Sequence, residues 1–305
     1  MNKHQAALFS FLSKAASGEA EMPPHVLDEF GELAKQALKK QFTYTKEPFR
    51  LRMSNVGRPL CQLQMEAMNV EPEAPDYDFK MRMIIGDVLE AVIIALLQAS
   101  GVEIKNKHKK VSLKVNDDEI QGEYDIELSD GIYDIKTVSP FAFESKFNAD
   151  DAFDKINNSD SFGYVSQGYG YGLASNKPFK GWIAINKSTG QIAVAEAPPN
   201  GKHKENTKNE IQNVHKAISD GRPFKRCFTD IEELYYKKST GNRTLGIECH
   251  YCPFKSKCWD GLEFRRQLPS KGRNPRFVWY THITQEWRDT INKEETSEVT
   301  FGLLS

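Results

Sequence analysis

Two aspartates and a lysine lie close together in GEYDIELSDGIYDIKT, residues 122–137. Asp125 falls near the end of one predicted strand and Asp134 within the next, so a hairpin would place the two carboxylates side by side at one sheet edge. Their charges repel unless a cation lies between them. Mg²⁺ or Mn²⁺ suits this position, because hard divalent ions take oxygen ligands and Mg²⁺ commonly binds one or two carboxylates plus a substrate phosphate.

Lys136 extends this chemistry. It lies two residues beyond Asp134, so in a strand both side chains point to the same face. There its ammonium can stabilise phosphate charge or help to orient an attacking water. Ile135 points into the core between them and can lend its backbone carbonyl to the metal. The alternative is an ordinary solvated strand face, on which Asp and Lys commonly alternate.

An acidic helix is predicted before these strands. Residues 79–99, FKMRMIIGDVLEAVIIALLQA, are apolar around most of the helix circumference but include Asp87 and Glu90. Burying an acid is unfavourable unless something compensates its charge, and a metal ion would do so. Glu90 is our candidate for a third carboxylate at the site, and Asp87 competes with it.

The remaining core elements follow from their periodicity. Residues 103–138 are short alternating runs broken by Asn, Asp and Gly, which predicts strands and hairpins. Residues 162–176 predict a helix on which Gln167 and Tyr171, four residues apart, share one face that suits packing or DNA contact. GWIAINK and QIAVAEA predict a further strand pair. This order of elements predicts an α/β (α+β) fold with a mixed central sheet flanked by helices.

Further helices and loops surround this core. Apolar spacing predicts helices over residues 5–16 and 24–41. Residues 201–220 predict a charged helix, and a further predicted helix starts near Gly57 and carries Cys61. The acidic, proline-containing EPEAPDYD is a predicted loop. We therefore expect a helical N-terminal arm (1–50), a core closed by the cysteines (51–262) and a basic, aromatic C-terminal extension (263–305).

The cysteines indicate a metal ligand set. Three of the five crowd into GIECHYCPFKSKCWD, namely Cys249, Cys252 and Cys258. This crowding suits a ligand cluster in a reducing compartment better than a disulfide framework. Cys61 is the candidate fourth ligand and would join the two ends of the core. Cys227 and His250 are spare ligands, although Cys227 is expected to be a small buried residue. Thiolates suit either an iron–sulfur cluster or Zn²⁺, and the spacing does not choose between them.

Four motifs carry a family resemblance. The ordered set Gly86–Glu90, Gly122–Asp125, Asp134–Lys136 and Gln167–Tyr171 resembles the PD-(D/E)xK nuclease superfamily, specifically its RecB-like branch. The resemblance implies a restriction-endonuclease-like core in which Asp125 and Asp134 bind the metal and Lys136 is the catalytic lysine. It also implies that Gln167 and Tyr171 line the DNA path. Many RecB-like members have His in the first-helix motif, where this chain has Glu90.

The cysteine pattern resembles a subset of the same branch. RecB-like nucleases with a 4Fe–4S cluster, including AddB and CRISPR-associated nucleases, have one cysteine before the nuclease motifs and three after them. This implies a largely structural 4Fe–4S cluster on Cys61, Cys249, Cys252 and Cys258, with Zn²⁺ at the same residues as the alternative.

Basic and aromatic residues mix near and beyond the cysteines. The basic residues are Arg222, Lys225, Arg226, Lys255, Lys257, Arg265, Arg266, Lys271, Arg273 and Arg276. The aromatic residues are Phe254, Trp259, Phe264, Phe277, Trp279 and Tyr280. This mixture suits single-stranded nucleic acid, with cations on phosphates and rings under bases. An ordinary solvated surface with some buried rings is the alternative.

Composition limits the function further. With 41 Lys and Arg against 42 Asp and Glu, any nucleic-acid surface must be local. Neither a signal peptide nor a membrane span is evident, so we expect a cytoplasmic protein without membrane partners.

The leading hypothesis is a metal-dependent DNA exonuclease acting on single strands or DNA ends, in replication, recombination or repair. The absence of a G-x-x-x-x-G-K-[ST] motif argues for a stand-alone enzyme, with a viral or CRISPR-associated origin as open alternatives. The alternative function is a non-catalytic nucleic-acid-binding scaffold with a structural metal cluster.

Overall fold

The computed structural model describes residues 1–43, 47–199, 201–268 and 276–291. Its contacts divide the chain into two compact units. The first unit comprises Met1–Arg58 and Pro75–Arg222, and the second comprises Pro59–Ala74 and the residues from Pro223 onward. The predicted domain boundaries stay predictions. In the described ranges, no helix is both long enough and apolar enough to cross a membrane.

The sheet of the first unit has five strands in the order β1-β2-β3-β4-β5. These strands are β1 (Ile104–Val115), β2 (Asp118–Leu128), β3 (Gly131–Val138), β4 (Phe179–Asn186) and β5 (Ile192–Glu196). Neighbouring strands run antiparallel except β3 and β4, which are parallel. A parallel pair needs a crossover, and the helical segment between β3 and β4 provides it. The predicted mixed sheet flanked by helices is therefore confirmed.

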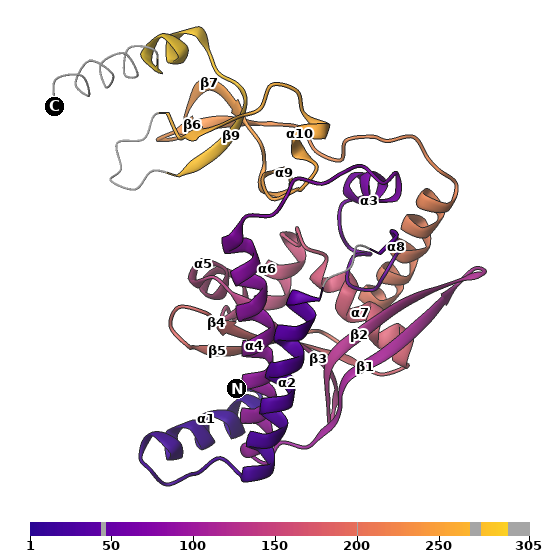
Figure 1. Ribbon diagram of the computed structural model, residues 1–305, viewed down its shortest axis with the longest axis vertical. Helices are drawn as coiled ribbons and strands as arrows, with labels where there is room; N and C mark the ends of the chain where they lie inside the picture. Colours follow the sequence, from indigo (N-terminus) through magenta and orange to yellow (C-terminus); the bar gives the residue numbers. More distant parts are fainter. Residues whose placement is uncertain (44–46, 200, 269–275, 292–305) are drawn as a thin grey trace, which may run out of the picture. The chain divides into compact units, whose positions relative to one another are not determined.

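Helices cover both faces of this sheet (Figure 1). Those before β1 are α1 (Lys3–Ala16), α2 (Pro24–Phe42) and α4 (Tyr77–Ala99). Those after β3 are α5 (Pro140–Ala142), the π-helical turn η1 (Phe143–Phe147), α6 (Ala152–Asn158), α7 (Tyr164–Ser175) and α8 (Gly201–Ser219). Ile93 and Ile94 of α4 pack with Ile135 on one face, while Tyr169 of α7 packs with Trp182 on the other. The sheet is thus buried on both sides around β3.

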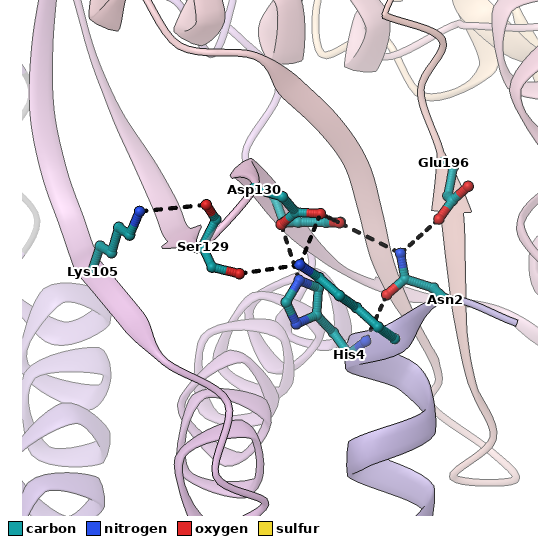
Figure 2. A network of polar contacts seen from close by, with 8 residues as sticks. Asn2, His4, Lys105, Ser129, Asp130 and Glu196 are labelled. Atoms are coloured by element: carbon teal, nitrogen blue, oxygen red, sulfur yellow. Dashed lines mark hydrogen bonds and ion pairs between the residues drawn. The ribbon is translucent and has the colours of Figure 1, made fainter.

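Polar contacts attach α1 to the sheet (Figure 2). The side chain of Asn2 caps α1 by accepting a hydrogen bond from the His4 N–H, and its Nδ2 donates to Glu196 Oε1 at 2.6 Å. His4 is buried, its ring meets the edge of Tyr133, and its Nε2 lies 3.0 Å from Asp130 Oδ1. The N-terminal helix is therefore an integral layer of the first unit.

The second unit contains a sheet that the sequence analysis did not predict. Its antiparallel order is β6-β7-β9-β8, with β6 (Ile231–Tyr235), β7 (Lys238–Thr244), β8 (Glu263–Arg266) and β9 (Phe277–His282). The helices here include α3 (Leu60–Ala67), α9 (Ile247–His250) and α10 (Lys255–Cys258), and residues 285–291 are helical as well. As predicted, the helix that follows Gly57 carries Cys61.

A buried carboxylate organises this second sheet. Glu233 is 4% exposed and accepts hydrogen bonds from the hydroxyl of Tyr280 at 2.5 Å and from the Asn242 side chain at 2.9 Å. The Thr240 hydroxyl donates a third, also at 2.9 Å. Donors of this kind are what a buried carboxylate requires. The charge of Glu233 is therefore satisfied by side chains from β7 and β9.

The glycines of α7 allow that helix to lie close to the sheet. A Cβ on Gly168 would lie 2.3 Å from the ring of Phe179, and one on Gly170 would lie 2.6 Å from the sulfur of Met53. The Phe179 ring cannot easily move, because it packs against Tyr169 and Trp182 with centroid separations of 5.6 and 5.0 Å. This close approach explains why α7 has glycine at these two positions.

Gly168→Ala should therefore destabilise the protein. The intrinsic helix preference of alanine contributes about 1 kcal/mol in its favour, but overpacking a core typically costs about 1–3 kcal/mol. Urea unfolding should show a lower midpoint than that of the wild type. Gly31→Ala in α2 is the matched control: nothing lies within 4 Å of its Cβ, so it should gain about 0.5–1 kcal/mol. A Gly168→Ala midpoint as high as the control's would contradict the packing.

Candidate active site

The two predicted aspartates lie side by side at the point where β2 and β3 part. Ile126 pairs with Tyr133, and one step further in the same antiparallel register Asp125 faces Asp134. Beyond that pair, Oδ2 of Asp125 accepts a hydrogen bond from the backbone N–H of Ile135 at 2.6 Å. A side chain thus links the two strands at the edge of the site.

Strand β1 has an unusual backbone conformation opposite Asp125. Lys107 pairs with Ile126 and Lys109 pairs with Tyr124, so His108 lies opposite Asp125. His108 has a φ of 46°, a left-handed conformation that is uncommon for a residue other than glycine. Its Nδ1 lies 3.4 Å from Oε1 of Glu90. Sequence analysis missed His108, because nothing in KNKHKK distinguishes it from its basic neighbours.

Asp134 stands out among the buried carboxylates. Three acidic residues in the described part of the chain are buried, namely Glu127, Asp134 and Glu233. Glu127 and Glu233 accept several hydrogen bonds. Asp134 is 1% exposed, and among the described residues its carboxylate has no hydrogen-bond donor other than the ammonium of Lys136. An ionised group in this position requires a nearby positive charge.

Lys136 supplies a positive charge at this position. Its Nζ lies 2.6 Å from Oδ2 of Asp134 and points to the same face of β3, as predicted. Burial alone would lower the pKa of Lys136, but the carboxylates of Asp134 and Asp125 outweigh that effect and hold the pKa above its usual value. The lysine is therefore a cation throughout the physiological pH range.

Glu90 and Asp87 differ in their surroundings although both lie on α4. Burial, followed by the nearby charge of Asp134, raises the pKa of Glu90 to about 7. Burial, Asp134 and Glu90 also raise the pKa of Asp125. Asp87 instead accepts a hydrogen bond from the Gln41 side chain at 2.7 Å. The structure thus brings Glu90 to the aspartates, while Asp87 bonds to α2.

Gln167 links the lysine to Tyr171. Its Oε1 accepts a hydrogen bond from Nζ of Lys136 at 3.3 Å, and its Nε2 donates to the Tyr171 hydroxyl at 3.0 Å. Tyr171 is only 2% exposed, so in this arrangement it holds Gln167 in place. The predicted DNA contact of these two residues stays a prediction.

The ring of Tyr164 also contacts the lysine, with Nζ of Lys136 4.9 Å from the ring centroid. Sequence analysis missed Tyr164, although its position three residues before Gln167 on a helix was an available signal.

The oxygen donors at this place suit a hard divalent ion. Among the residues that the structure describes, no group of three or more His, Cys, Asp or Glu side chains has the arrangement of a metal site. The fit of a divalent ion to this site depends instead on the buried carboxylate of Asp134, on Asp125 and on the carbonyl of Ile135. In a strand the C=O of a residue points to the same side as its N–H, so this carbonyl faces β2. Mg²⁺ commonly binds few protein ligands and completes its shell with water and phosphate.

The five cysteines all belong to the second unit. Cys61 lies on α3, and the three predicted partners lie on or beside α9 and α10. Burial raises the pKa of the Cys61 thiol to about 12, with smaller contributions from Cys227 and Cys252. Burial raises that of Cys249 to about 11, and Cys252 and Cys258 add to the effect. The predicted ligand cysteines therefore lie near enough to one another to interact electrostatically.

One expectation about the cysteines is wrong. Cys227 is exposed and lies at a bend outside any helix or strand, and its sulfur accepts a hydrogen bond from the backbone N–H of Cys61 at 3.1 Å. His250, the other spare ligand, packs its ring against Tyr251 and Phe264. Cys61 and Cys227 are thus neighbours, so each of the two thiols is a candidate for the fourth ligand.

The predicted basic and aromatic residues have different environments. Phe254 and Tyr280 are buried, whereas Phe264 and Phe277 are exposed. Arg226 lies over the ring of Trp259, with its guanidinium carbon 4.2 Å from the centroid. Lys271 and Arg273 lie outside the described residues.

Comparisons with known proteins do not assign a family. No family model matches the chain, and no curated protein matches it. The crystal structure of SSO0001 aligns with 75% of this chain and 95% of its own length, at 15% identity and a TM-score of 0.42. A candidate exonuclease from Eubacterium rectale aligns with 70% of this chain and 75% of its own, at 13% identity and a TM-score of 0.33. Both TM-scores are below 0.5, so neither similarity assigns a function to this chain.

The neighbouring thiols allow a test of the ligand set. If Cys61 is a ligand, Cys61→Ser should lose the bound metal, whereas Cys227→Ser should keep it, because the Cys227 thiol is exposed and is not one of the predicted four. Iron and zinc per chain and the visible absorbance of the purified variants measure this. Iron with a brown colour supports the cluster, and zinc supports the alternative. Equal losses in the two variants would contradict the choice of Cys61.

Proposed function

We propose that the protein is a metal-dependent DNA nuclease that hydrolyses phosphodiester bonds, acting as an exonuclease on single strands or DNA ends. The observation that carries the proposal is the carboxylate of Asp134. It is buried, faces Asp125 and has the ammonium of Lys136 2.6 Å from its Oδ2, with no further hydrogen-bond donor among the described residues. A site of this composition suits a cation and a phosphate together, because the carboxylates attract the first and the ammonium attracts the second.

Each residue has a distinct part in the proposed reaction. A bound Mg²⁺ or Mn²⁺ would supply a Lewis acid and a more acidic water. Asp125, Asp134 and the Ile135 carbonyl would hold the ion, with Glu90 as a further carboxylate. Lys136 would hold the scissile phosphate or orient the attacking water, and Gln167 would fix the direction of its ammonium through the contact at 3.3 Å.

The cysteines complete the proposal. We infer that Cys61, Cys249, Cys252 and Cys258 hold a structural 4Fe–4S cluster, with zinc as the alternative. The motif order supports placing the chain with the RecB-like nucleases, whose reactions serve replication, recombination or repair. A non-catalytic scaffold is the competing function, and the absence of a three-residue metal group among the described side chains favours it.

Loss of Lys136 should abolish cleavage. Removing a charged group that stabilises a transition state typically lowers the rate by about 10²–10³-fold. End-labelled single- and double-stranded DNA, digested with Mg²⁺ or Mn²⁺, should be cut by the wild type and not by Lys136→Ala. Asp134→Asn, which keeps the side-chain shape, should also be inactive.

Lys110→Ala is the matched control, because Lys110 lies on the exposed side of β1 and should leave the rate unchanged. A wild type that cuts no substrate with either metal supports the scaffold function. Equal cutting by the wild type and Lys136→Ala would show that the catalytic lysine is misassigned.

Metal should stabilise the lysine variant more than the wild type. Lys136→Ala leaves the buried charge of Asp134 without its cation, which typically costs about 3–5 kcal/mol. In this variant a divalent ion would take the place of the missing ammonium and would not be repelled by it. A ligand that binds the native state raises the stability of that state. The rise in Tm on adding Mn²⁺ should be larger for Lys136→Ala than for the wild type or Lys110→Ala. Identical rises in the three proteins would contradict a metal site at Asp134.

A further inference from the structure

The hairpin of β8 and β9 presents aromatic side chains on one face. Phe264 pairs with Trp279, and Arg266 pairs with Phe277. Directly opposed residues of an antiparallel pair share a face, and residues two apart on one strand do so as well. The three rings and the guanidinium of Arg266 therefore lie on the same side of the hairpin. The other side carries Val278 and Tyr280, which are buried in the core of the second unit.

The rings on this aromatic face contact one another but remain open to solvent. The centroid of Phe264 lies 4.7 Å from that of Trp279 and 5.5 Å from that of Phe277. Phe264 and Phe277 are each 51% exposed. An ordinary surface strand carries polar side chains on its outer face, whereas this hairpin is aromatic there. Contiguous exposed rings of this kind mark a binding surface.

Positive charge accompanies the rings. The Nζ of Lys255 lies 4.8 Å from the centroid of Trp279. Burial, followed by the charges of Arg276 and Lys255, lowers the pKa of His250, whose ring contacts Phe264. Lys255 is ion-paired with Glu73, so Arg276 is the cation that the margin of the aromatic face offers to a phosphate, and Arg266 lies on the face itself. A purely apolar protein partner would not require these charges.

We propose that the aromatic face binds single-stranded nucleic acid, with unpaired bases stacked on Phe264, Trp279 and Phe277 and phosphates near Arg266 and Arg276. Stacking on rings suits every base, because each base has an aromatic face, and the cations follow the backbone. A duplex hides its base faces within its own stack, so it binds this surface poorly. The binding is independent of the proposed nuclease reaction, because neither Lys136 nor a divalent ion takes part.

The test measures binding without cleavage. Fluorescence anisotropy of a labelled oligothymidine with the full chain, in EDTA, gives Kd, and a duplex of the same length is compared. Phe264→Ala with Phe277→Ala should weaken single-strand binding roughly tenfold or more. Phe264→Leu with Phe277→Leu keeps apolar bulk but removes the rings, so it should weaken binding without loss of stability. Phe264→Tyr with Phe277→Tyr should bind like the wild type.

Tyr236→Asn is the matched control. It removes an 85% exposed ring of the same unit from a turn with a φ of 47°, which asparagine tolerates. The control should bind the oligonucleotide like the wild type. The proposal is overturned if the paired leucine variant binds as tightly as the wild type. It is also overturned if the duplex competes equally, or if the wild type does not bind single strands, in which case a protein partner becomes the occupant to seek.

Discussion

The constraint on which the first unit depends is the charge of Asp134, which is buried with the ammonium of Lys136 as its polar neighbour. Such a charge persists only where a cation compensates it. Lys136 does so, and its own direction is set by Gln167, which in turn bonds to Tyr171. That chain of contacts requires α7 to lie directly on the sheet, which its glycines permit. The arrangement of the site and the packing of α7 on the sheet therefore both serve to compensate the charge of Asp134.

Much of this arrangement could be predicted from the sequence because it follows from local periodicity. A hairpin between two alternating runs places Asp125 opposite Asp134, and the two-residue period of a strand places Lys136 on the same face as Asp134. The four-residue spacing of Gln167 and Tyr171 fixed their common helical face in the same way. These statements need only the period of an element and the residues within it.

The remainder depends on contacts between distant segments. Glu90 and Asp87 lie three residues apart on one helix, and only the position of Gln41 on α2 shows which acid is held away from the aspartates. His108 lies beside Glu90 only because β1 and α4 come together in the fold, and no turn residue in the sequence marks its left-handed backbone conformation. The second sheet was not predicted, because β7, KSTGNRT, has no apolar alternation. Side chains of β7 and β9 instead meet at the buried Glu233 through hydrogen bonds. The exposure of Cys227 likewise depends on how distant segments of the chain pack together.

The second unit is built from two separated stretches of chain, which has a consequence for biosynthesis. Its first stretch, with α3 and Cys61, leaves the ribosome about 150 residues before the rest of the unit. At typical translation rates of about 5–20 residues per second, this segment waits roughly 7–30 s for its packing partners. During that interval the first unit can fold, whereas Cys61 remains a lone thiol on an unsupported helix. Any metal shared by these cysteines can therefore be inserted only after the chain is almost complete, which makes the metal a late step of maturation.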